Sequence, residues 1–120
     1  MANYVVLIDL EHSKIFKLHP DKVDEQTLQR HEVRHHSGAD KEKNQHKNPE
    51  KFVHDVAGRL GDAHEILLIG PGQAKVHFKE HLERHDHAVG KKVVGMETVD
   101  HPTDGQIVAL AKKFFKAYLG

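Results

Sequence analysis

The sequence predicts an α/β fold in one domain, with a mixed five-stranded sheet and three helices. Two runs, YVVLIDL (4–10) and HEILLIG (64–70), are almost continuously apolar, as is typical of strands buried on both faces. Strand-like segments follow one another near the start of the chain, whereas helical and strand-like segments alternate after residue 48. A length of 120 residues is enough for one hydrophobic core but not for two.

The first three elements are predicted to be strands. The run 4–10 is followed by a tight turn at EHS and by a second strand, KIFKLH (14–19). The segment 27–36 alternates weakly, because Leu28 and Val33 are apolar among mostly polar neighbours. We therefore expect an edge strand there, with one face in water.

A helix is expected after a long polar segment. Asn48 can cap its start, Pro49 is tolerated at the first helical position, and Gly61 can end it. The apolar residues between them recur at helical spacing and form one stripe. They are Phe52, Val53, Val56, Ala57 and Leu60.

The strand 64–70 leads into a second helix. The sequence GPGQ (70–73) is expected to open this helix, which should end near HDH (85–87) or Gly90. Apolar residues four positions apart share one of its faces. They are Ala74, Phe78 and Leu82.

One more strand and one more helix complete the pattern. The strand is expected at 92–100, and Thr103 and Gln106 have the spacing of a capping box before the last helix. Its wide apolar face consists of Ile107, Leu110, Ala111, Phe114, Phe115 and Tyr118. The resulting order, three strands and then alternating helices and strands, is that of a three-layer ribonuclease H-like fold.

The composition restricts the classes of function. Lys plus Arg and Asp plus Glu number 18 each, so no overall positive charge attracts nucleic acid, and we expect no DNA partner. The 13 histidines would make the surface strongly positive in mild acid. The absence of cysteine excludes disulfides and thiolate zinc sites. No segment resembles a signal peptide or reaches transmembrane length, so we expect a cytoplasmic protein without a membrane partner.

A metal-dependent hydrolase is one alternative that the fold prediction raises. Nucleases with this order of elements need several carboxylates that converge on magnesium ions. Asp9, near the end of the first strand, is a candidate, but the strand 64–70 ends without an acidic residue. The set of carboxylates is therefore incomplete, and a turn residue is the simpler interpretation of Asp9.

A histidine-based metal site is a second alternative. His77, His81 and His85 recur every four residues and so share one helix face, where pairs can ligate zinc or nickel. A water-facing helix also tolerates histidines at little cost, and ordinary surface residues are the preferred interpretation. The metal prediction rests on these three residues, and otherwise no cofactor is expected.

The glycine-rich turn GPGQ (70–73) has two interpretations. Backbone N–H groups between a strand and a helix can bind phosphate, but the spacing fits neither a dinucleotide-binding nor a phosphate-binding loop. A tight turn, in which glycine allows close packing, is the preferred interpretation. Ser13 and Ser37 are the only serines, and neither lies in a nucleophile elbow.

Two segments carry a resemblance to a known family. ILLIGPGQAKVHFKEHL (66–82) and VVGMETVDHPTDGQIVALAKKFF (93–115), in this order of elements, resemble small bacterial proteins often labelled translational machinery proteins. These are similar to the middle domain of archaeal and eukaryotic class 1 peptide release factors and of Pelota. The resemblance spans nearly the whole chain and implies a single release-factor-like domain over 1–120, with the ribosome or tRNA as partner.

The resemblance also draws attention to the long polar segment, which we expect to be a flexible loop at 36–48. In release factors the matching loop carries a Gly-Gly-Gln tripeptide that assists hydrolysis of peptidyl-tRNA. Here the segment has one glycine, Gly38, and one glutamine, Gln45, so no catalytic residue is assigned and peptide release is not expected. Pelota-type domains also lack the tripeptide and act without hydrolysis.

The same segment is rich in residues that bind phosphate. Lysine, arginine and protonated histidine contact RNA backbones, although two acidic residues dilute the charge here and no aromatic side chain is present to stack on bases. The candidate RNA-binding residues are Arg34, His35, His36, Lys41, Lys43, His46 and Lys47. A solvated linker is the alternative. The preferred hypothesis is a non-catalytic, translation-associated protein of unknown oligomeric state.

Overall fold

The computed structural model describes residues 2–9, 12–19, 22–29 and 49–119. Within these ranges one sheet has the strand order β3-β2-β1-β4-β5. Its strands are β1 (Ala2–Ile8), β2 (His12–Leu18), β3 (Val23–Gln29), β4 (Ala63–Gly70) and β5 (Val93–Thr98). The pairs β1–β2 and β2–β3 are antiparallel, whereas β1–β4 and β4–β5 are parallel. The predicted mixed five-stranded sheet is confirmed.

Four helices lie in the described part of the chain, so the prediction of three was wrong by one. They are α2 (Pro49–Gly58), α3 (Ala74–His85), α4 (His87–Gly90) and α5 (Asp104–Leu119). The second predicted helix, α3, ends at His85, within the HDH segment (85–87) where one of its two expected ends lay, and Asp86 has φ −149° and ψ 65°. A Cβ on Gly90 would lie 3.3 Å from the backbone of Leu82, so the short α4 packs closely back against α3.

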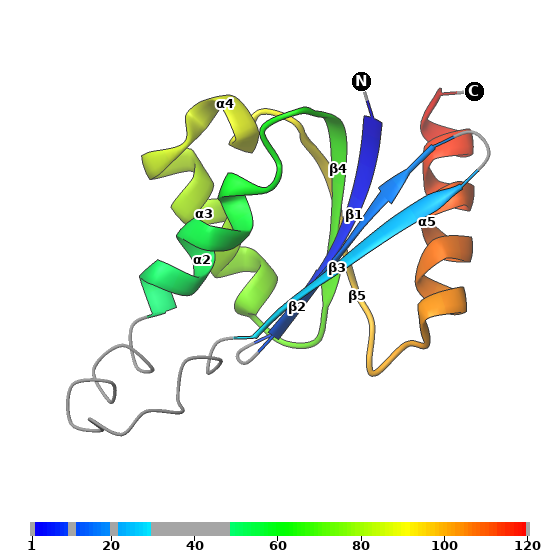
Figure 1. The fold of residues 1–120 in the computed structure, drawn as a ribbon, viewed down its shortest axis with the longest axis horizontal. Helices are drawn as coiled ribbons and strands as arrows, with labels where there is room; N and C mark the ends of the chain where they lie inside the picture. The colour runs from blue at the N-terminus through cyan, green and yellow to red at the C-terminus, as the bar shows by residue number, and fades with distance from the viewer. Residues whose placement is uncertain (1, 10–11, 20–21, 30–48, 120) are drawn as a thin grey trace.

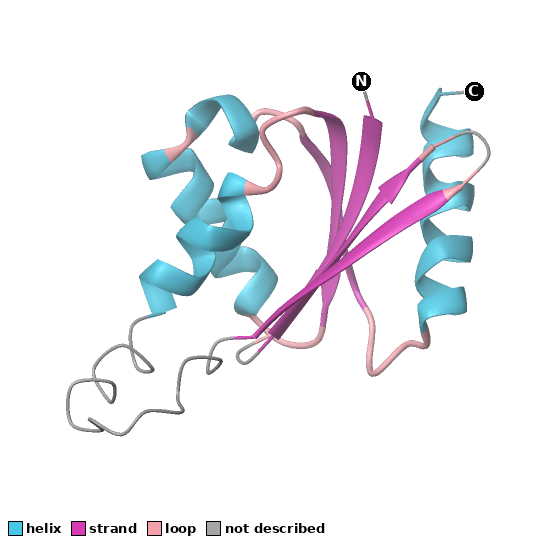
Figure 2. Ribbon diagram, in the orientation of Figure 1, coloured by secondary structure: helices cyan, strands magenta, loops and turns pink. Residues whose placement is uncertain are grey.

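The helices cover both faces of the sheet and give the expected three layers. Figure 1 shows α2, α3 and α4 on one face and α5 alone on the other. The same arrangement is visible by element type in Figure 2, where the magenta sheet separates the two groups of helices. No helix within the described ranges is long and apolar enough to cross a membrane.

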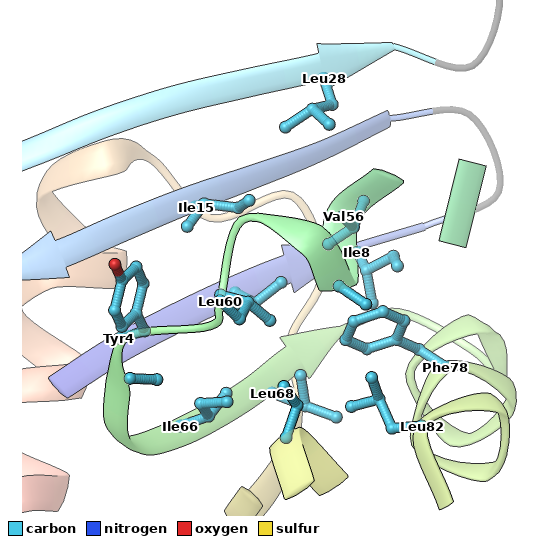
Figure 3. Close-up of a cluster of buried hydrophobic side chains, with 14 of the residues drawn as sticks. Tyr4, Ile8, Ile15, Leu28, Val56, Leu60, Ile66, Leu68, Phe78 and Leu82 are labelled. Carbon is cyan, nitrogen blue, oxygen red and sulfur yellow. The ribbon is translucent and has the colours of Figure 1, made fainter. Parts of the chain in front are cut away.

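The larger hydrophobic core lies between the sheet and the three helices on its first face. Figure 3 shows side chains from the sheet meeting side chains from α2 and α3. From the sheet come Tyr4, Val6, Ile8, Ile15, Leu28, Ile66 and Leu68, and from the helical side come Phe52, Val56, Leu60, Phe78, Leu82 and Val89. The predicted stripe of α2 is thereby confirmed as core-facing, and so are Phe78 and Leu82 of α3, whereas Ala74 is only partly buried.

The second core lies between the sheet and α5. It contains Val5, Leu7, Phe16, Leu67 and Ile69 from the strands and Ile107, Ala111 and Phe115 from the helix. Neighbouring residues of β1, such as Val5 and Val6, therefore enter different cores, because successive side chains of a strand point to opposite faces. This double burial explains why β1 and β4 have continuously apolar sequences.

The third strand begins earlier than the sequence predicts. It was expected at 27–36, but β3 starts at Val23, and residues 30–36 lie outside the described part of the chain. Its register is set by pairing, from Leu18 opposite Val23 to His12 opposite Gln29. The N–H of His19 donates to the carbonyl of Lys22 at 2.9 Å and closes the hairpin directly. A mostly polar edge strand has too weak an alternation to reveal this register.

The start of α5 has the predicted capping box. The backbone N–H of Gln106 donates to the hydroxyl oxygen of Thr103 at 3.1 Å, and the N–H of Thr103 donates to the side-chain oxygen of Gln106 at 2.9 Å. Both N–H groups would otherwise lack helical partners. This prediction from spacing is confirmed.

A polar network joins three elements at the amino ends of β1 and β4. The Tyr4 hydroxyl donates to Asp62 at 2.5 Å, and the Lys17 ammonium donates to the other oxygen of Asp62 at 2.7 Å. Hydrogen bonds from Lys17 and then from Tyr4 lower the pKa of Asp62 to about 2. The carboxylate therefore ties β1 and β2 to the turn that precedes β4.

A candidate site at the carboxyl ends of the central strands

The parallel strands β1 and β4 end at the same edge of the sheet, and a pocket lies just beyond them. Its volume is about 570 Å³. The residues that line it come from the β1–β2 turn and from the start of α3: Asp9, His12, Pro71, Gly72, Gln73, Ala74 and His77. We call it the strand-end pocket. Open α/β sheets characteristically bind ligands at this edge.

Asp9 and His12 form one wall of the strand-end pocket. The N–H of Asp9 donates to the carbonyl of His12 at 3.1 Å, and the N–H of His12 donates to Oδ1 of Asp9 at 2.9 Å. The same oxygen lies 3.3 Å from Nδ1 of His12. The carboxylate therefore both shapes the turn and orients the imidazole ring, as the simpler interpretation of Asp9 expects.

The arrangement does not supply the carboxylates that the hydrolase alternative needs. The last residue of β4 is Gly70, so this strand ends without a carboxylate, as the sequence indicates. In the described ranges no group of three or more histidine, aspartate or glutamate residues is arranged to hold a metal ion. Asp9 is thus a turn residue that holds His12, and the described residues favour no two-metal site around it.

The GPGQ turn forms the opposite wall and is tight, as expected. Gly70 has φ 150°, and a Cβ there would lie 2.3 Å from the carbonyl oxygen of Ile8. Gly72 has φ 62°, in the left-handed region that favours glycine. Both glycines are therefore required by the backbone path between β4 and α3.

Lys75 holds this turn from beneath, a role that the sequence does not signal. It is only 5% exposed, and its ammonium donates to the carbonyls of Gly70 at 3.0 Å and Gly72 at 2.8 Å. A lysine one residue into an amphipathic helix is normally expected in water. Only the folded turn provides the carbonyl oxygens that make its burial favourable.

The three histidines of α3 are distributed over two locations. His77 lines the strand-end pocket, whereas the rings of His81 and His85 lie side by side with centroids 4.7 Å apart. His81 is half-buried and His85 is exposed. The structure therefore does not gather the three into one group, and zinc or nickel binding remains a prediction for them.

The strand that precedes the candidate RNA-binding segment ends beside the strand-end pocket. The last residue of β3, Gln29, is paired with His12 of the pocket. Figure 1 shows the start of α2, at Pro49, at the same end of the molecule. The candidate residues themselves fall within 30–48, outside the described residues: Arg34, His35, His36, Lys41, Lys43, His46 and Lys47.

Comparison with known proteins identifies the fold. Neither a protein-family model nor a curated protein matches the sequence. Among solved structures, Pelota from Archaeoglobus fulgidus matches 93% of this chain with 16% identity and a TM-score of 0.66. Pelota from Thermoplasma acidophilum matches 93% with 16% identity and a TM-score of 0.68. An archaeal translation termination factor, aRF1, matches 98% with 15% identity and a TM-score of 0.61.

These similarities establish the architecture and no more. At 15–16% identity the shared feature is the fold. The chain spans only 31% and 32% of the two Pelota chains and 41% of the aRF1 chain. The chain therefore has the fold of a release-factor-like domain, as the resemblance predicts.

Proposed function

We propose that this protein is a non-catalytic, cytoplasmic component of translation that binds the ribosome or tRNA. The observation that carries the proposal is the fold similarity to Pelota and to an archaeal translation termination factor, which extends over 93–98% of this chain. A likeness over nearly the whole chain is consistent with the bacterial release-factor-like family that the sequence resembles. The rest of the proposal depends on chemistry that this chain carries itself.

The proposed contact surface is the cationic segment between β3 and α2. Seven residues there would bind backbone phosphates: Arg34, His35, His36, Lys41, Lys43, His46 and Lys47. The rest of the chain balances their charge, since the formal net charge is zero. Binding by a local cluster on a neutral protein should be weak and strongly salt-dependent.

The proposed role does not include peptide release. The sequence contains no Gly-Gly-Gln tripeptide. Asp9, the acidic candidate at the strand ends, accepts a hydrogen bond from the backbone of its own turn. A binding role uses the fold without requiring either group to catalyse hydrolysis.

Sedimentation through a ribosome gradient tests the proposal directly. We expect the tagged protein to comigrate with a subunit or monosome at low salt and to dissociate at moderate salt. Replacing Lys41, Lys43 and Lys47 with alanine should weaken the association and lower its salt slope by about 3, because each lysine that binds a phosphate adds roughly one to that slope.

A matched variant controls for the loss of charge alone. Lys112, Lys113 and Lys116 are exposed on α5, across the sheet from α2. Replacing them with alanine removes the same number of charges and should leave most of the association intact. Absence of the wild type from every ribosomal fraction, with or without nuclease treatment, would contradict the proposal.

Metal binding is a second candidate because His81 and His85 already lie together. Their ring centroids are 4.7 Å apart, a separation that lets two imidazoles approach one ion after small rotations. Zinc or nickel titration followed by calorimetry tests it. Stoichiometric uptake that is lost in H81A and H85A, and reduced in H77A, would support the site, whereas uptake unaffected by these changes would contradict it.

A further inference from the structure

We propose that the strand-end pocket binds a single unstacked nucleobase, with adenine preferred. The inference rests on the proposed function, because it specifies what part of an RNA the pocket would take. Proteins recognise single-stranded RNA chiefly by splaying bases out of the stack and holding them in pockets. The strand-end pocket offers the size, the planar side chains and the hydrogen-bonding group that such recognition needs.

The size and lining of the pocket suit a flat heterocycle. Its volume of about 570 Å³ lies within the range of small-ligand sites. Pro71 and Ala74 contribute apolar surface, and Gly72 adds no side chain that would fill the space. A base can therefore enter without displacing a core residue.

Two imidazoles supply planar surfaces from different elements. His12 starts β2 and His77 belongs to the first turn of α3, and both line the pocket. The carboxylate of Asp9 lies 3.3 Å from Nδ1 of His12 and restrains that ring. A preoriented ring loses little conformational freedom when a base stacks on it.

Gln73 supplies the group that distinguishes one base from another. It is the residue before α3, its side chain makes no capping hydrogen bond, and it is exposed at the pocket wall. Within the described part of the chain, no hydrogen-bond partner holds its amide. A glutamine amide presents a donor and an acceptor side by side, and these match N6 and N7 of adenine.

The position of the pocket fits an RNA strand that also contacts the cationic segment. His12 is paired with Gln29, the last residue of β3 before that segment. A base held by the pocket would place its own backbone near the end of β3, from which the chain continues towards the proposed phosphate-binding residues. The base contact would then provide the specificity for adenine, and the phosphate contacts would provide affinity without regard to sequence.

Titration of the full-length protein with adenosine, followed by NMR, tests the inference. Adenosine carries no phosphate, so it separates base recognition from anion binding. We expect amide shifts to concentrate at Gly72, Gln73 and His77, with smaller shifts from cytidine and none from ribose 5-phosphate at the same concentration. Equal shifts from ribose 5-phosphate, or adenosine shifts confined to other residues, would overturn the proposal.

Three variants make the test specific to the proposed contacts. H77A should weaken adenosine binding roughly tenfold, as expected for removal of a stacking partner. Q73A should remove most of the preference for adenosine over cytidine while both nucleosides still bind. H64A is the control, because His64 is exposed at the amino end of β4, and it should bind adenosine like the wild type. Equal affinities in H77A and H64A would contradict the stacking role.

The two proposals fail separately. Adenosine binding at the pocket without ribosome association would refute the translational role and leave a nucleoside site. Salt-dependent ribosome association without any shift at the pocket would refute this inference alone.

Discussion

The ammonium of Lys75 donates a hydrogen bond to the carbonyl oxygen of Gly70 at 3.0 Å, and so joins α3 to the last residue of β4. The same carbonyl accepts the N–H of Val99 at 3.2 Å, just after β5. Lys75 also reaches the carbonyl of Gly72 at 2.8 Å. One buried side chain thus fixes the turn that forms a wall of the strand-end pocket.

Replacing Lys75 with methionine should destabilise the protein by about 1–3 kcal/mol, because the buried carbonyl of Gly70 and the more exposed carbonyl of Gly72 each lose the hydrogen bond from its ammonium. Urea unfolding measures the effect. K79M is the control, since Lys79 makes an i,i+4 pair with Glu83 on the surface, and such pairs contribute only about 0.3–0.5 kcal/mol. Similar decreases in stability in the two variants would show that Lys75 does not stabilise the turn.

Replacing Gly70 with alanine should lower the free energy of unfolding by about 1–3 kcal/mol, the typical range for a strained backbone position. The added Cβ would lie 2.3 Å from the Ile8 carbonyl oxygen, so the ends of β4 and β1 would have to separate. G61A tests the specificity of this effect, because a Cβ on Gly61 meets nothing within 4 Å. Thermal or urea unfolding compares the two, and a decrease in G61A as large as in G70A would contradict the argument.

The stability contributed by Asp62 should disappear in acid. Its pKa is about 2 in the folded protein, against an ordinary value of 3.8, so its contribution is present above pH 4 and lost as the pH falls towards 2. D62N should therefore be less stable than the wild type at pH 7, and the difference should shrink between pH 4 and pH 2. Urea unfolding at several pH values measures it.

Two outcomes would bear against the Asp62 network. A difference between D62N and the wild type that stays constant down to pH 2 would mean that the carboxylate charge is not the source. Y4F removes one of the two donors and keeps the Lys17 bond, so it should retain part of the acid dependence, and its complete disappearance in Y4F would contradict a role for Lys17.

Replacing Thr103 with alanine should cost about 1 kcal/mol, because the N–H of Gln106 loses its partner at the start of α5. T103S keeps the hydroxyl and should remain within a few tenths of a kcal/mol of the wild type. Chemical denaturation followed by circular dichroism compares the three proteins. Equal stability of T103A and T103S would exclude a role for the capping hydroxyl.

Residue patterns predicted most of the architecture because burial on two faces leaves a strong signal. The runs around Val5 and Leu67 are apolar at nearly every position since alternate side chains enter the two cores. The helical stripes and the Thr103–Gln106 spacing were equally informative, because both depend on contacts within a few residues. Local periodicity identifies such elements before any tertiary contact is known.

Features that depend on partners elsewhere in the chain were predicted poorly. The start of β3 at Val23 depends on its register with β2, and a polar edge strand carries little evidence of that register. The short helix α4 after Asp86, which the sequence did not predict, depends on the close approach of Gly90 to Leu82. Neither contact lies within one repeat of a helix or strand, so neither leaves a periodic pattern.

The sequence by itself determined the order of elements and the faces that are buried. It also identified Asp9, His77 and the GPGQ turn, each as a separate candidate for a functional role. Only the tertiary structure decided that these belong to one pocket together with His12, and that Lys75 is buried beneath it. The reason is geometric. Periodicity shows which side of an element faces the core. A site at the ends of parallel strands, in contrast, is assembled from residues far apart in the chain. These residues meet only when β1 and β4 pair.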